Sequence, residues 1–98
     1  MESQELQQLL ETQPTWHVAI LEYGMTHSVM RIALHQGDFP RYNEVILGGV
    51  VTFHGAMQGG PYRLQIRAPD AEGQMIIVDE QGQFEVQCTR ITMGRIRR

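Results

Sequence analysis

The side chains that most often carry out chemistry are few in this chain and widely spaced. It contains four histidines, His17, His27, His35 and His54, and a single cysteine, Cys88. Histidines that bind one metal ion together are often two residues apart on a strand or four apart on a helix. No two histidines have either spacing, and Cys88 has no neighbouring cysteine. The sequence therefore predicts no metal site.

Nucleophilic catalysis requires a serine or cysteine beside a base that is itself held in place. Ser28 follows His27 directly, but adjacent residues of a regular strand point to opposite faces of the sheet. Cys88 alternates with Val86 and Phe84, a pattern typical of a buried strand face. The carboxylates of Asp38, Asp70, Glu72 and Glu80 fall in predicted turns or loops, where such groups usually accept hydrogen bonds from the local backbone. The pattern favours a protein without enzymatic activity, catalytic residues or a cofactor, but it does not decide the question.

The centre of the chain, residues 48–61, holds five of the ten glycines. A nucleotide-binding P-loop needs a lysine, and all eight basic residues here are arginines. The glycines also lack the spacing of a dinucleotide-binding loop, and no predicted helix follows them. We therefore assign them to bends, bulges and a hairpin within a β-sheet.

Length and composition indicate a single domain that spans residues 1–98. The chain has 42% hydrophobic residues and a formal net charge of −3, which favours no particular class of partner. One cysteine excludes an internal disulfide and suggests a reducing compartment. The longest apolar run, residues 45–51, is too short to cross a membrane, and the first residues do not resemble a secretion signal. We expect a cytoplasmic protein with no membrane contact.

Hydrophobic spacing predicts one helix at the beginning of the chain, over residues 3–13. Leu6, Leu9 and Leu10 form a narrow apolar stripe on one face. Ser3 is a suitable N-cap, and Pro14 ends the helix. A helix this short needs a sheet or a partner on which to lay its leucines.

From Trp16 onward the hydrophobic period is two, which is typical of strands. We expect strands at residues 16–23, 28–35, 45–54, 61–68, 75–79 and 83–92. In residues 45–54, apolar side chains occupy both the odd-numbered and the even-numbered positions, which predicts a central strand covered on both faces. Glycine-containing turns without intervening helices favour antiparallel pairing. The predicted fold is α+β and mainly β, an N-terminal helix packed on a five- to six-stranded antiparallel meander or small barrel.

The best candidate for a binding surface is the longest loop, residues 36–43. Phe39, Arg41 and Tyr42 have the aromatic and arginine composition that is enriched at interface hot spots. Tyr62 and Arg63 follow the central turn and could extend the same surface. The alternative is that Phe39 and Tyr42 fold back to fill an open end of the barrel. On the first interpretation, the chain is a small non-enzymatic binding or regulatory module. It would recognise a protein partner through this loop and an exposed strand edge, and form a homodimer in one version of the hypothesis.

Two other functions stay open. A small-molecule-binding barrel would use His35, His54 and Tyr62 around a cavity, with an unrecognised catalytic rim as one variant. The C-terminal residues 90–98 hold half of the arginines, which would suit nucleic-acid contact. The net acidic charge and the absence of aromatic residues among those arginines argue against that use.

Overall fold

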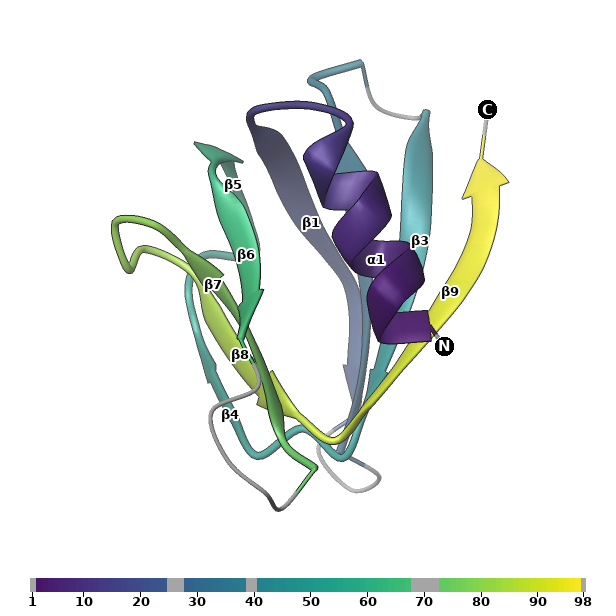
Figure 1. Cartoon of the computed structure of the whole chain (residues 1–98), viewed down its shortest axis with the longest axis vertical. Helices are drawn as coiled ribbons and strands as arrows, with labels where there is room; N and C mark the ends of the chain where they lie inside the picture. Colours follow the sequence, from purple (N-terminus) through teal and green to yellow (C-terminus); the bar gives the residue numbers. More distant parts are fainter. Residues whose placement is uncertain (1, 25–27, 39–40, 68–72, 98) are drawn as a thin grey trace.

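The computed structural model describes residues 2–24, 28–38, 41–67 and 73–97 (Figure 1). Within these ranges it contains one helix and nine strands. Their bounds are α1 (Glu2–Glu11), β1 (Trp16–Gly24), β2 (Val29–His35), β3 (Tyr42–Gly48), β4 (Thr52–His54), β5 (Gln58–Tyr62), β6 (Leu64–Arg67), β7 (Met75–Asp79), β8 (Glu85–Cys88) and β9 (Arg90–Arg97).

The strands form two antiparallel sheets. One has the order β5-β1-β2-β3-β9 and the other the order β4-β8-β7-β6. Strands that follow one another in the sequence are neighbours in β1-β2-β3 and in β6-β7-β8, so the predicted antiparallel meander and the mainly β fold with one helix are confirmed. The described strands do not close into one barrel.

The strand predicted over residues 45–54 is in fact two strands in different sheets. β3 lies in the five-stranded sheet, and β4 lies at an edge of the four-stranded sheet. The chain changes sheets between them: Val50 N–H donates to Ser28 O, and Val51 N–H donates to Gln87 O. Gly49, with φ +63°, makes this change of direction possible. The continuous apolar run concealed the change because both parts pack on the same core.

Two other predicted strands are also divided between the two sheets. The span predicted as residues 61–68 becomes β5 and β6, which separate at Arg63, and the span 83–92 becomes β8 and β9, which separate at Thr89. Arg63 N–H donates to Asp79 Oδ1 at 3.0 Å, and Thr89 N–H donates to Gly48 O at 3.0 Å. At each of these points the chain moves from one sheet to the other at a single residue, whose N–H is bound by a part of the chain distant in sequence.

Helix α1 covers the opening between the two sheets and packs against β9 and β6 (Figure 1). Leu6 and Leu10 are buried, and the indole Nε1–H of Trp16 donates to Leu10 O at 3.3 Å. The end of the helix is therefore held against the start of β1. Within the described residues, no helix has the length and hydropathy needed to span a membrane.

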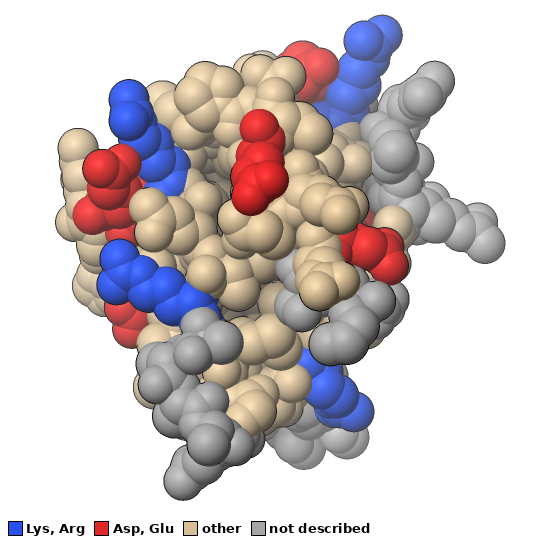
Figure 2. Space-filling model, viewed as in Figure 1, with Lys and Arg blue, Asp and Glu red and all other residues tan. Residues whose placement is uncertain are grey.

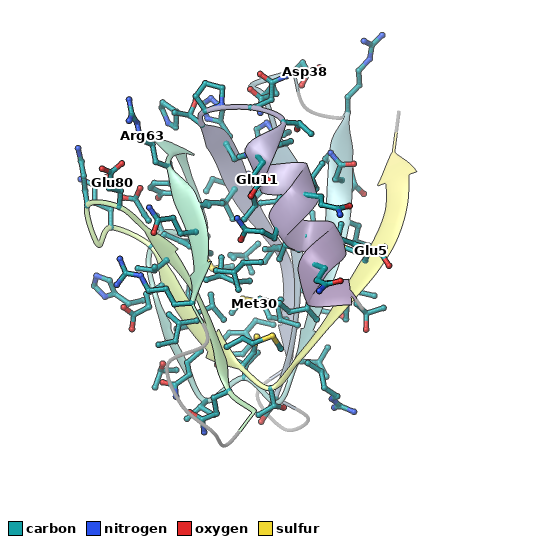
Figure 3. The ribbon with its side chains drawn as sticks, viewed as in Figure 1. Glu5, Glu11, Met30, Asp38, Arg63 and Glu80 are labelled. Atoms are coloured by element: carbon teal, nitrogen blue, oxygen red, sulfur yellow. The ribbon has the colours of Figure 1, made fainter. Side chains whose placement is uncertain are left out.

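The core lies between the two sheets and the helix. Met30 lies at its centre, whereas the labelled charged residues of α1 and the loops lie around the outside (Figure 3). Phe84 is fully buried, and its ring packs against Phe53 and Tyr62 with centroid distances of 5.8 and 5.6 Å. This aromatic cluster joins the four-stranded sheet to β5.

Candidate binding cleft

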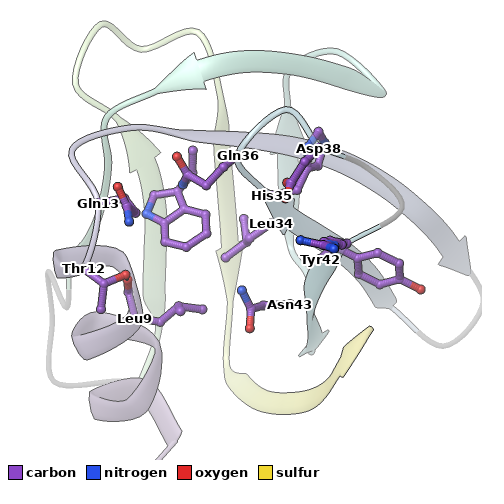
Figure 4. A pocket seen from close by; sticks show the side chains of 11 residues that line it. Leu9, Thr12, Gln13, Leu34, His35, Gln36, Asp38, Tyr42 and Asn43 are labelled. Atoms are coloured by element: carbon purple, nitrogen blue, oxygen red, sulfur yellow. The ribbon is translucent and has the colours of Figure 1, made fainter. Parts of the chain in front are cut away.

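A cleft of about 480 Å³ lies where the end of α1 meets the connection between β2 and β3 (Figure 4). It is formed by two parts of the chain that are distant in sequence: residues 9–16, from the end of α1 to the start of β1, and residues 34–38 with 41–43, on either side of the β2–β3 connection. Its lining residues are Leu9, Thr12, Gln13, Trp16, Leu34, His35, Gln36, Asp38, Arg41, Tyr42 and Asn43.

The floor of the cleft is apolar. Trp16 and Leu34 are buried, and Leu9 is half-buried beside them. Leu9 belongs to the same helical stripe as Leu6 and Leu10, but its side chain is only partly covered by the core. The apolar surface that Leu9 keeps in solvent is available to a ligand, and burying it would stabilise a complex.

The rim consists mainly of neutral polar groups. Gln13 lies on the helix side of the cleft and Asn43 on the β3 side, with Leu34 between them (Figure 4). Gln36 Nε2 donates to Thr15 O at 2.9 Å, which ties the loop after β2 to the segment before β1. Thr12 Oγ1 donates to Leu9 O at 2.6 Å. Side-chain amides offer both donors and acceptors, so this rim can pair with a ligand of mixed polarity.

One acidic and one basic side chain complete the rim. Asp38 and Arg41 are both exposed, and the Arg41 N–H donates to Asp38 O at 3.1 Å. This backbone bond joins two residues that both line the cleft. The pair adds no net charge there.

His35 lies between this cleft and a smaller one of about 250 Å³ lined by His17, Val18, His35 and residues 58–60. The backbone N–H of Gly37 donates to His35 Nδ1 at 3.1 Å. Burial, and secondarily the neighbouring His17, lower the pKa of His35, while Asp38 acts in the opposite direction. A protonated Nδ1 could not accept the Gly37 N–H, so this hydrogen bond is compatible only with the neutral imidazole of His35.

The predicted binding residues do not all meet at one place. Arg41 and Tyr42 line the cleft, whereas Phe39 lies outside the described residues. His54 is exposed on β4, and Tyr62 is buried with its ring stacked on Phe84. His35, which the barrel hypothesis grouped with His54 and Tyr62, instead joins Arg41 and Tyr42.

Arg63 belongs to a separate cleft of about 470 Å³, whose lining is Thr15, Pro61, Arg63, Asp79, Glu80 and Gln81. Its guanidinium lies 3.8 Å from the carboxylate of Glu80, and the two labels are neighbours in Figure 3. Both side chains are well exposed, so this ion pair adds little stability.

Sequence reasoning missed Leu9, Trp16 and Asn43 as members of a site. Leu9 was recognised only as part of the core stripe, and Trp16 only as the first residue of a strand. Nothing in their spacing indicates that the helix end and the β2–β3 connection come together. The sequence feature that did indicate this site is the long loop with its arginine and aromatic residues.

The described residues contain no group of three or more histidine, cysteine, aspartate or glutamate side chains able to hold a metal ion. Acidic and basic side chains are intermixed on the face shown in Figure 2, with no extended region of one sign among the residues coloured there. Arg90 is exposed, and the other arginine side chains of the C-terminal segment lie outside the description.

Comparison of the chain with protein-family models, with curated proteins and with solved structures found no match.

Proposed function

We propose that this protein is a binding module that takes a short segment of a partner protein in the cleft between the end of α1 and the β2–β3 connection. The observation that carries the proposal is the combination of an apolar floor at Leu9 and Leu34 with a rim of amide side chains and an exposed arginine.

Peptide chemistry suits this lining. A peptide presents alternating backbone donors and acceptors, which Gln13 and Asn43 can pair with, and an apolar side chain can lie on Leu9. Arg41 would bind a carboxylate of the segment, and Asp38 a basic group. These interactions fix the orientation of the bound segment, while the apolar floor supplies most of the affinity.

The side chains of the cleft are better suited to binding than to group transfer. The Thr12 hydroxyl already donates to Leu9 O, and His35 Nδ1 already accepts the Gly37 N–H. A nucleophile and its base need a direct hydrogen bond to each other, and neither group is directed in that way.

A small molecule is the second candidate ligand, and the observation that favours it is the size of the cleft. Its volume of about 480 Å³ falls within the range of ordinary ligand pockets. Such a ligand would contact His35 and Tyr42 from this cleft, because Tyr62 faces the core and His54 belongs to the other sheet.

Selection from a library of displayed random peptides, followed by affinity measurement on the selected peptides, tests the proposal. Arg41→Ala should weaken binding by about tenfold or more, the usual loss for one charge-assisted hydrogen bond. Arg63→Ala is the matched control, because it removes the same guanidinium group from the other cleft. Equal affinities of the two variants, or a library that yields no specific binder, would contradict the proposal.

A further inference from the structure

The two sheets have four edge strands, and three of them carry features that oppose pairing with another chain. Helix α1 packs against β9 and β6. β6 also carries the exposed Arg67, and β5 contains Pro61, which has no N–H to donate. Charged residues, proline and covering elements are the ordinary ways in which proteins protect sheet edges.

β4 has none of these features. Among the described elements, only β8 pairs with it, which leaves its other side without a strand. The segment from Val51 to Met57 contains no acidic residue, arginine or proline, and its only ionisable side chain is His54. Every residue of this segment except Phe53 is exposed.

The described residues expose three large hydrophobic side chains, and two of them belong to this same segment. The three are Tyr23, Val51 and Met57, with 36%, 58% and 59% of their surfaces exposed. The Tyr23 ring contacts that of Phe53 edge-on at a centroid distance of 6.1 Å. Met57 O accepts a 2.7 Å hydrogen bond from Ile20 N–H, which holds Met57 beside β1. Exposed apolar side chains thus precede and follow, in the sequence, a strand with one edge that no described strand covers, and exposed apolar residues beside such an edge are typical of interaction sites.

We infer that the free edge of β4 pairs antiparallel with β4 of a second copy of this chain. A two-fold axis places an edge against itself, so an edge bearing arginines meets like charge, whereas the uncharged segment Val51–Met57 does not. Pairing would join the two four-stranded sheets into one of eight strands and cover Val51 and Met57 in both copies.

The self-association site is separate from the proposed peptide cleft. β4 lies toward the lower left of the molecule in Figure 1, and the β2–β3 connection that borders the cleft lies at the top. A dimer formed through β4 would therefore leave both clefts accessible. Either proposal can fail without the other, because one concerns the oligomeric state and the other concerns peptide affinity.

Sedimentation equilibrium over a range of protein concentrations tests this inference. The wild-type chain should show a concentration-dependent monomer–dimer equilibrium. Val51→Lys and Met57→Lys should each raise the dimer dissociation constant by about tenfold or more, because each copy would bring an ammonium group into an otherwise uncharged interface. Gln65→Lys, the same new charge at an exposed position on β6, should leave it unchanged.

Circular dichroism establishes that each variant keeps its fold. If Val51→Lys unfolds, Val51→Thr, which keeps the shape and removes apolar surface, takes its place and should weaken the dimer in the same direction. A wild-type chain that stays monomeric at every concentration, or a dimer weakened as much by Gln65→Lys as by Val51→Lys, would overturn the inference.

Discussion

His17 and His35 face each other across β1 and β2, with their rings stacked 5.3 Å apart at an interplanar angle of 17°. Burial chiefly, and then the neighbouring His17, lower the pKa of His35, whose Nδ1 also accepts the N–H of Gly37. Protonation of His35 at Nδ1 would remove its hydrogen bond with the Gly37 N–H, which lies just after β2.

Acidification should destabilise the protein through His35. The pKa of His35 is lowered in the folded chain from its ordinary value of 6.5, so the unfolded chain binds the proton first as the pH falls. The stabilising contribution is fully present above pH 6.5 and is lost as the pH falls through the lower folded value. Urea unfolding at a series of pH values measures this loss.

His35→Asn is the matched variant, because the amide oxygen of asparagine can accept the Gly37 N–H in place of Nδ1 and does not titrate. Its unfolding free energy should depend less on pH below 6.5 than that of the wild type. Identical pH profiles would show that His35 does not carry the effect.

The free energy of unfolding should depend on the ion pair between Arg31 and the buried carboxylate of Glu44. Glu44 is buried on β3, and Arg31 Nε on β2 donates to its Oε2 at 2.9 Å. Because Arg31 is about a third exposed, Arg31→Met should cost about 1–3 kcal/mol, less than the loss of a partner in a fully buried pair.

A double-mutant cycle measures the coupling between these two residues. Glu44→Gln should recover part of the stability lost in Arg31→Met, because it removes the buried charge that has lost its partner. Additive effects of the two substitutions in urea unfolding would contradict this account.

Gly60 should tolerate substitution much less well than Gly82. Both have positive φ, +127° and +74°, but a Cβ at Gly60 would lie 2.8 Å from His17 Cα and 2.9 Å from Trp16 O, whereas nothing lies within 4 Å at Gly82. Gly82→Ala should cost about 1 kcal/mol for backbone strain alone, and Gly60→Ala about 3 kcal/mol because backbone atoms must also move. Equal losses of stability in thermal or urea unfolding would contradict the expectation that the close approach of β5 to β1 makes substitution of Gly60 more costly.

Cys88 should be unreactive in the folded protein. Its side chain is fully buried, and burial raises the pKa of its thiol to about 11. Only the thiolate attacks disulfide reagents, so Ellman's reagent at pH 8 should label Cys88 slowly in buffer and rapidly in urea. Rapid stoichiometric labelling without denaturant would contradict the described burial.

The regular parts of this fold were predictable because each depends on local patterning. The stripe of Leu6, Leu9 and Leu10 predicted α1, and alternation predicted the residues that form β1, β2 and β7. The passages between sheets were not predictable, because Gly49, Arg63 and Thr89 interrupt apolar runs for one or a few residues without a distinctive pattern. Hydrophobic period identifies the buried residues but not the sheet to which they belong.

The candidate cleft was predictable only in part, for a related reason. Arg41 and Tyr42 were conspicuous in a long loop, whereas Leu9 and Trp16 join them only through the packing of α1 against the start of β1. That packing depends on tertiary contacts such as the bond from the Trp16 indole to Leu10 O. A sequence read one segment at a time does not contain them.

The most direct test of the proposed function is an amide chemical-shift map of the labelled protein titrated with a library-selected peptide. We expect saturable shifts at Leu9, Thr12 and Gln13 on one side of the cleft, and at Gln36 and residues 41–43 on the other. Shifts confined to the cleft lined by Arg63 and Glu80, or to β4, would contradict the assignment of the binding site.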